Sequence, residues 1–182
     1  MTIYVALLRA INVSGHNMIK MAELKSMLES MGLQQIQTYI QSGNVVFEAK
    51  GDAETLRLQI EDQIKLTFQL TIDVIIRTAD ELRQIITECP YDENTLPEGA
   101  GIHVSFIQST PPQDRAALLS NIEEELDKCH LVGRDLYLLL HKGVKNSKVL
   151  SASAKLRVPA TVRNWRTVNK LLAMVDDIER TR

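Results

Sequence analysis

The chain has 182 residues, and 45% of them are hydrophobic, which is enough for a substantial core in one large domain or in two small lobes. Its 21 basic and 23 acidic residues give a formal net charge of -2, so no overall positive field would draw the protein to nucleic acid. The only cysteines, Cys89 and Cys129, form no CxxC motif and argue against a disulfide framework.

No membrane or export signal is visible in the sequence. The opening apolar run ends at Leu8 and lacks the basic start and the cleavage site of a signal peptide. No stretch approaches the roughly 20 apolar residues that a membrane-spanning helix needs. We therefore predict a cytoplasmic protein without a membrane partner, and the sequence does not indicate its oligomeric state.

The first part of the chain alternates between strand and helix patterns. Residues 2–8 form an apolar run rich in β-branched and aromatic side chains, typical of a buried strand, and a long polar loop follows. Helical spacing over 21–31, a hairpin over 36–47, a second amphipathic helix and a strand over 72–76 give the order βαββαβ. This is the order of the ferredoxin-like unit, in which two helices cover one face of a four-stranded antiparallel sheet.

The second part of the chain repeats most of this order. A capping box at Thr78-Ala79-Asp80-Glu81 begins a connecting helix, and a strand is predicted over 102–107. Pro111-Pro112 should open a helix, and a hairpin should surround Gly133. In that helix we expect four inward side chains, namely Leu118, Leu119, Ile122 and Leu126.

The C-terminal region ends the repeat without an eighth strand. A weak helix is predicted over 149–156 and a stronger one over 161–175. The predicted fold class is α+β, with two ferredoxin-like lobes of which the second is modified and ends in helices. We expect the first lobe at 1–78, a connecting helix and loop at 79–101, and the second lobe at 102–182.

Three segments of the chain resemble a known family. They are Leu7-Leu8-Arg9-Ala10-Ile11-Asn12-Val13-Ser14-Gly15, the hairpin at 38–47, and Ala160-Thr161-Val162-Arg163-Asn164-Trp165-Arg166-Thr167. They are similar to an uncharacterised family of small bacterial proteins, a domain of unknown function with Leu-Leu-Arg-Gly-Ile-Asn-Val-Gly-Gly near the start and Thr-x-Arg-Asn-Trp near the end. The resemblance spans nearly the whole chain and implies no established activity. Ala10 and Ser14 stand where the family pattern has glycine; if those glycines have positive φ, this loop should differ in shape or affinity.

Hydrogen-bonding side chains gather in the loop after the first strand, in the hairpin, in a basic loop and at the start of the last predicted helix. An arginine beside the free N–H groups of a helix N-terminus suits a phosphate or carboxylate. We therefore predict a small anionic ligand in a cleft near the Arg9 loop and the Arg163 helix start. The predicted ligand-binding residues are Arg9, Asn12, Asn17, Lys20, Ser42, Asn44, Lys145, Arg163 and Asn164.

Other interpretations of these residues stay open. Asn12 and Asn44 are common turn residues that bond to nearby backbone, and Arg163 could brace the two lobes. Nucleic-acid recognition is disfavoured, because Asn44 and Val46 stand where an RNA-binding sheet would present stacking aromatics. A protein-interaction module that uses an exposed sheet face is a further alternative.

The sequence shows no recognisable catalytic or cofactor motif. The four histidines lack metal-ligand spacing, and neither a Walker A sequence nor GxGxxG is present. Cys129 and His130 would point to opposite sides of a strand, which disfavours a thiolate–imidazole pair. We predict no metal and no cofactor. Whether the protein is an enzyme stays open; such an enzyme would bind its substrate through Arg163 and use His16 as acid or base.

Overall fold

The computed structural model describes residues 1–122, 126–141, 143 and 147–182. Its contacts divide the chain into two compact units: unit 1 comprises Met1–Gln84 and Asn169–Arg182, and unit 2 comprises Ile85–Val168. The sequence predicts other boundaries, at 78 and 101, and these stay a prediction. None of the helices in the described part of the chain combines the length and apolar character that a membrane span requires.

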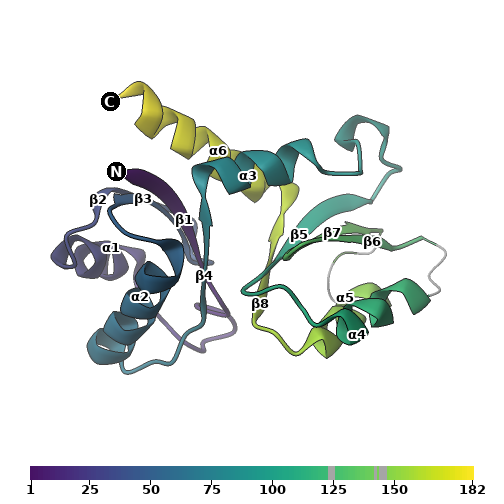
Figure 1. Ribbon diagram of the computed structural model, residues 1–182, viewed down its shortest axis with the longest axis horizontal. Coiled ribbons are helices and arrows are strands. Elements are labelled where there is room, and N and C mark those ends of the chain that lie inside the picture. Colours follow the sequence, from purple (N-terminus) through teal and green to yellow (C-terminus); the bar gives the residue numbers. More distant parts are fainter. Residues whose placement is uncertain (123–125, 142, 144–146) are drawn as a thin grey trace. The chain divides into compact units, whose positions relative to one another are not determined.

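Two copies of one element order make up the chain (Figure 1). The first copy comprises β1 (Thr2–Leu8), α1 (Met21–Ser30), β2 (Gln34–Tyr39), β3 (Asn44–Ala49), α2 (Ala53–Phe68), β4 (Val74–Thr78) and α3 (Ala79–Thr87). After the short η1 (Glu93–Thr95), the second comprises β5 (Gly101–Ile107), α4 (Gln113–Ala116), η2 (Ala117–Asn121), β6 (Lys128–Val132), β7 (Asp135–Leu140), α5 (Lys148–Ser153), η4 (Ala154–Leu156), β8 (Ala160–Asn164) and α6 (Trp165–Arg180).

The strands form two four-stranded antiparallel sheets, ordered β2-β3-β1-β4 and β6-β7-β5-β8. Both orders are that of the ferredoxin-like unit, so the predicted α+β fold class is confirmed. In unit 1, α1 and α2 cover one face of the sheet (Figure 1), and the core between them includes Tyr4 and Phe47, whose stacked rings lie 5.8 Å apart. Buried leucines and isoleucines of both helices complete this core, which excludes water from the sheet.

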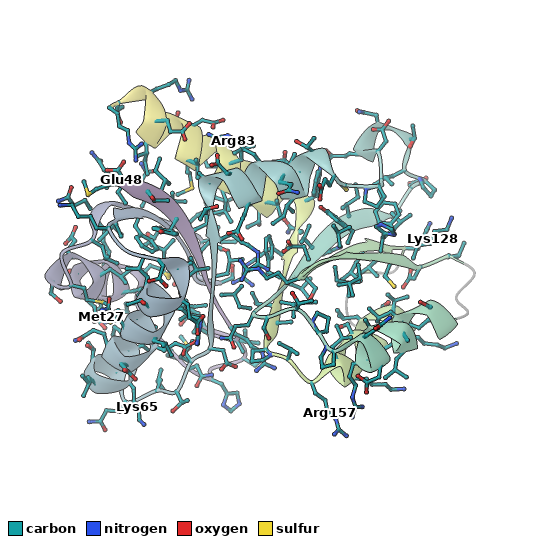
Figure 2. The ribbon with its side chains drawn as sticks, in the orientation of Figure 1. Met27, Glu48, Lys65, Arg83, Lys128 and Arg157 are labelled. Carbon is teal, nitrogen blue, oxygen red and sulfur yellow. The ribbon has the colours of Figure 1, made fainter. Side chains whose placement is uncertain are left out.

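Local sequence signals set where several helices begin. Asp52 caps α2, because its carboxylate accepts a hydrogen bond from the Thr55 N–H at 2.9 Å. The predicted capping box of α3 is confirmed: Thr78 Oγ1 accepts from the Glu81 N–H at 3.1 Å, and Glu81 Oε2 accepts from the Thr78 N–H at 2.7 Å. Within unit 1, Arg83 of α3 then bonds Asp176 of α6 at 2.9 Å (Figure 2).

The strand β8 corrects the prediction that no eighth strand exists and that a helix begins at Thr161. Residues 160–164 pair with β5, with Thr161 opposite Phe106 and Asn164 opposite His103. The β-branched Thr161 and Val162 favour an extended chain. The helix starts only at Trp165, where Asn164 Oδ1 accepts a hydrogen bond from the Thr167 N–H at 2.8 Å. The predicted helix over 149–156 is confirmed as α5 and η4.

The helix predicted after Pro111-Pro112 is much shorter than its leucine pattern indicates. α4 has 4 residues, and η2 adds 5 in 3-10 geometry. Leu119 is buried and Ile122 partly buried, as predicted, but Leu118 and Leu126 are 38% and 54% exposed, so their inward orientation was wrong. The backbone is already extended at Ile122, and this takes Leu126 out of the helical register.

The loop between β1 and α1 holds several non-glycine residues in the left-handed region. Ala10 and Ser14 have φ of 53° and 49°, and Asn12 and Asn17 have φ of 53° and 48°. Asparagine tolerates this region because its side chain can bond locally, whereas alanine and serine meet a steric cost of roughly 1 kcal/mol or more. Ala10 and Ser14 thus stand in a conformation that glycine adopts freely.

Replacing Ala10 with glycine should therefore stabilise the protein. We expect Ala10→Gly to raise the free energy of unfolding by about 0.5 to 1 kcal/mol, which is about 1 to 4 °C in Tm for a chain of this size. Thermal unfolding followed by circular dichroism measures the shift. The matched control is Ala22→Gly, at an exposed position inside α1, which should destabilise by about 1 kcal/mol. A loss of stability in Ala10→Gly would show that the loop is not strained at this residue.

Candidate functional site

In unit 1, the predicted site residues Asn12 and Asn17 hold the loop in which they lie. Asn12 Nδ2 donates to the carbonyl oxygens of Ile19 at 2.9 Å and Gln41 at 2.8 Å, while its Oδ1 accepts from the Ile19 N–H at 2.8 Å. Asn17 Nδ2 donates to the Ala10 carbonyl at 3.0 Å. Because Gln41 belongs to the β2–β3 turn, Asn12 joins the loop to the hairpin.

The predicted cations of the loop have acidic neighbours in unit 1. Arg9 Nη1 lies 2.9 Å from Asp73 Oδ2, and Lys20 Nζ lies 3.4 Å from Glu23 Oε1. The Arg9 and Asp73 side chains are 50% and 39% exposed, so solvent screens their attraction, which is worth no more than about 1 kcal/mol. Arg9 is therefore paired with Asp73 while half of its side chain remains accessible to solvent.

The predicted hairpin residues form a local network in unit 1. Asn44 is fully buried, and its Nδ2 donates to the Tyr39 carbonyl at 3.0 Å and to Ser42 Oγ at 2.9 Å. The structure thus brings the loop and the hairpin together, since the Leu8 N–H also donates to the Gly43 carbonyl at 2.8 Å. These bonds fix the turn; anion binding by the same residues stays a prediction.

Arg163 and Asn164 belong to unit 2, where they are the last two residues of β8, immediately before α6 begins at Trp165. Arg163 is buried, and its Nη1 donates to Thr161 Oγ1 at 2.7 Å and to the Val162 carbonyl at 3.0 Å. Burial lowers the pKa of Arg163 to about 10, so the guanidinium stays charged at neutral pH. Asn164 caps α6, as described above. The predicted Lys145 lies outside the described residues.

A cavity of about 380 Å³ lies in unit 2, beside the edge strand β6. Its wall combines apolar and polar side chains from η2, β6, α5 and the segment after α3. The lining residues are Pro90, Tyr91, Leu119, Ser120, Ile122, Asp127, Lys128, Cys129, His130 and Val149. A second cavity, of about 430 Å³, lies against the same strand and shares Leu119, Ser120, Cys129 and His130 with the first.

The cavities of unit 2 lie beside helices that are shorter than those of unit 1. In unit 1, α1 and α2 have 10 and 16 residues, whereas α4 and α5, at the corresponding places in unit 2, have 4 and 6. The core under α4, η2 and α5 is built from Leu136, Leu138 and Leu140 of β7, with Cys129 and Leu131 of β6 packed only partly against it. The helices therefore leave the edge of the sheet at β6 incompletely covered.

Two basic side chains line the first cavity, and the sequence between its lining residues Ile122 and Asp127 begins Glu123-Glu124-Glu125. Lys128 and His130 alternate along β6, which places both on the same side of the strand, and both are exposed. Figure 2 shows Lys128 at the end of β6. Asp127, the one carboxylate among the described lining residues, is directed to His141, because its Oδ1 accepts from the His141 N–H at 2.8 Å and lies 3.6 Å from His141 Nδ1.

The other titratable groups at the cavity are suited to binding rather than to nucleophilic attack. Burial raises the pKa of the Cys129 thiol, so little of the reactive thiolate exists at neutral pH. Burial also raises the pKa of Tyr91 to about 12, which keeps its phenol a neutral hydrogen-bond donor. Cys129 and His130, adjacent in β6, point to opposite sides of the strand, as predicted. In the described part of the chain, no group of three or more His, Cys, Asp or Glu residues could hold a metal ion.

The sequence-based prediction missed the residues around this cavity, notably Tyr91, Ser120, Lys128 and His130. The alternation of Lys128 and His130 was available as a signal, since it places two basic side chains on one side of a strand. The cavity itself could not be predicted from the sequence, because it depends on how soon the helix after Pro112 ends. The leucines at 118, 119 and 126 indicated a longer helix.

The Asn12 bonds predict a structural effect that needs no ligand. Asn12→Ala should lower the free energy of unfolding by about 2 kcal/mol, because three hydrogen bonds are lost and the Ile19 N–H is left without its acceptor. Urea unfolding of the ligand-free protein measures the loss. Asn17→Ala removes a single bond and should cost about 1 kcal/mol or less. Equal stability of wild type and Asn12→Ala would contradict a structural role for this side chain.

His103 on β5 predicts a pH dependence of stability. Its Nδ1 is buried without a hydrogen-bond partner in the described part of the chain, and burial lowers its pKa below the ordinary 6.5. As the pH falls below about 6.5, the unfolded state takes up a proton that the folded state refuses, so stability decreases. Between pH 7 and 5, His103→Gln should lose less stability than wild type, by at most about 1.4 kcal/mol per pH unit.

Urea unfolding at a series of pH values tests the role of His103. His16→Gln, at an exposed loop position, is the comparison and should follow the wild-type curve. Parallel curves for wild type and His103→Gln would show that burial of this imidazole does not contribute to the pH dependence.

Comparisons with known proteins support the fold and leave the activity open. One solved structure that matches is that of the conserved bacterial protein SP0830 from Streptococcus pneumoniae, with a TM-score of 0.76 and 20% sequence identity over 95% of this chain and 98% of that one. At this identity the likeness shows a shared fold. A search of curated proteins found no match. Residues 1–137 match the family described as "Protein of unknown function (DUF1697)", and the chain therefore belongs to that family.

Proposed function

We propose that this protein binds a small anionic molecule in the unit 2 cavity beside β6. The observation that carries the proposal is the pair of exposed basic side chains, Lys128 and His130, on one side of an edge strand at the cavity wall. A volume of about 380 Å³ falls within the range of small-molecule sites, which are typically concave and apolar with a few polar groups. The sequence predicts the same class of ligand, although at Arg9 and Arg163.

The charges of the described lining residues support binding of an anion over a neutral molecule. Asp127 interacts with His141, so it does not compete directly for Lys128. Ser120 and Tyr91 add hydroxyl groups that can donate to an anionic oxygen. Leu119, Ile122 and Val149 provide the apolar part of the wall. Lys128 is exposed, so its contact with an anion contributes at most about 1 kcal/mol, or roughly a fivefold change in Kd.

A thermal-shift and calorimetric screen tests the proposal. The probes are inorganic phosphate, adenosine monophosphate, butyrate and hexanoate, each with wild type, Lys128→Ala and Lys155→Ala. Lys155 is the matched control, since it is exposed on η4 of the same unit and does not line the cavity. We expect one or more probes to raise the Tm of wild type and of Lys155→Ala, and to bind Lys128→Ala up to about fivefold more weakly. An unchanged Kd in Lys128→Ala, or no shift with any probe, would contradict it.

A further inference from the structure

Strand β6 lies at one edge of the unit 2 sheet, and its ladder is regular. In the described part of the chain it pairs with β7 alone, and the register runs without a shift from Lys128 to Val132. The corresponding edge strand of unit 1, β2, has a register shift between Gln34 and Gln37, where Gln35 has a φ of 51°. Such a break hinders pairing with a further strand. Unit 1 therefore has a protected edge, whereas β6 has an open one.

The backbone of β6 presents hydrogen-bonding groups to this open edge. Successive residues of an antiparallel strand direct their N–H and C=O groups to opposite neighbours. The Arg134 carbonyl accepts a hydrogen bond from the Ile107 N–H of β5 at 2.9 Å, so the even-numbered residues that follow in β7 face β5 and the odd-numbered ones face β6. Those odd-numbered residues pair with residues 128, 130 and 132. The N–H and C=O groups of Cys129 and Leu131 therefore point away from β7.

The side chains of β6 differ between its two sides. Cys129 and Leu131 pack partly against the core under the helices of unit 2, whereas Lys128 and His130 are exposed on the opposite side. A strand added at the open edge would continue this alternation, with one set of side chains beside Cys129 and Leu131 and the other set beside the two basic residues. Carboxylates in the second set would be complementary to the Lys128 ammonium, and the His130 imidazole can donate a hydrogen bond to them.

Space for the inward side chains of an added strand exists beside β6. The two cavities of unit 2 share Leu119, Ser120, Cys129 and His130, so they are neighbours along the strand. Successive inward side chains of a strand are neighbours in the same way, roughly 6.5 to 7 Å apart. The cavity walls combine aliphatic carbon, as in Leu119, with hydrogen-bonding groups, as in Ser120. This mixture suits valine and threonine, which also favour an extended chain.

We infer that the open edge of β6 binds an extended peptide of a partner protein, in which acidic residues alternate with valine or threonine. The peptide adds a fifth strand to the unit 2 sheet by pairing with Cys129 and Leu131. Its carboxylates contact Lys128 and His130, and its other side chains enter the two cavities. In this mode of recognition main-chain hydrogen bonds supply affinity and alternate side chains supply specificity. The inference goes beyond the proposed function, because its main contacts are made by the backbone of β6.

Hydrogen exchange of individual amides, followed by NMR on the full chain, tests the pairing. The probe is a capped peptide of about seven residues in which glutamate alternates with valine and threonine, long enough to cover the 5 residues of β6. When this peptide is bound, we expect the Cys129 and Leu131 N–H groups to exchange at least about tenfold more slowly, because they gain acceptors. The Lys128 and His130 N–H groups, which already face β7, are the internal controls and should change less. Unaltered exchange at Cys129 and Leu131 in the bound protein, or no binding of the peptide, would overturn the inference.

Methylation of the peptide backbone separates main-chain contacts from side-chain contacts. An added strand directs only alternate N–H groups toward β6. One probe is therefore methylated at every glutamate nitrogen, and a second at every valine and threonine nitrogen. We expect calorimetry to show that one of the two loses binding while the other retains it. Equal affinity of the two methylated peptides would contradict pairing through the backbone.

A change of charge at Lys128 tests the acidic character of the partner. Lys128→Glu should bind the glutamate peptide about fivefold to tenfold more weakly than wild type, because a cross-strand attraction becomes a repulsion. It should also bind a version with lysine in place of glutamate more tightly than wild type does. The matched control is Lys155→Glu, at an exposed position of η4 that lines neither cavity, and it should behave as wild type. Equal affinity of wild type for the glutamate and lysine peptides would overturn the acidic partner.

Two further outcomes would assign this region to another ligand. Protection of Cys129 and Leu131 that increases with protein concentration in the absence of peptide would replace the peptide with a second copy of this chain. Binding of phosphate or butyrate that weakens in Lys128→Ala, without binding of the peptide, would overturn this inference and retain the proposed function. No binding of the peptide, of phosphate or of any carboxylate would overturn both.

Discussion

The structure depends on one constraint, namely that each four-stranded sheet must bury an apolar face under helices supplied by its own βαββαβ unit. Unit 1 meets this constraint with two long helices, and its core from Tyr4 to Ile76 is continuous. Unit 2 meets it with shorter segments, so the centre of the sheet at β7 and β5 is buried while the edge at β6 is not fully covered. The cavities beside β6 thus lie where the second unit has little helix.

The loop after β1 shows how hydrogen bonds maintain a strained backbone conformation. Four non-glycine residues between 10 and 17 have positive φ, a conformation that costs roughly 1 kcal/mol or more for alanine or serine. Such a loop persists only where surrounding bonds outweigh the strain. Asn12 supplies them by bonding the N–H and the carbonyl of Ile19 near the end of the loop and the Gln41 carbonyl of the hairpin. Asparagine also tolerates its own left-handed backbone. The polar residues that look like a ligand site in the sequence therefore have a structural role that accounts for their presence.

Sequence patterns predicted the parts of the fold that depend on local chemistry. The caps at Asp52 and Thr78 and the turn before Asn44 follow from side chains that bond their own neighbouring backbone, so they could be placed without tertiary information. β8 was missed because only five residues separate Pro159 from Trp165, and the apolar stripe of α6 begins immediately afterwards. The exposure of Leu118 and Leu126 could not be predicted, because it depends on the helix ending at Asn121 despite a favourable leucine pattern.

Comparison of the two repeats indicates which features belong to the fold that they share. Arg77 of β4 lies opposite Val5 of β1, and Arg163 of β8 lies opposite Val104 of β5. Both arginines occupy the fourth position of the last strand of their repeat. Each is buried, donates to the preceding carbonyl at 3.0 Å, and is followed by a residue that caps the next helix, Thr78 or Asn164.

A feature present at the same position in both repeats is best explained by the fold that they share. This argues that Arg163 is part of a repeated strand–arginine–cap–helix arrangement and not a residue that distinguishes unit 2. What distinguishes unit 2 is the replacement of two long helices by α4, η2, α5 and η4. Since a duplicated scaffold acquires a specific site where its copies differ, the edge of β6 is the part of this molecule where ligand chemistry should be sought.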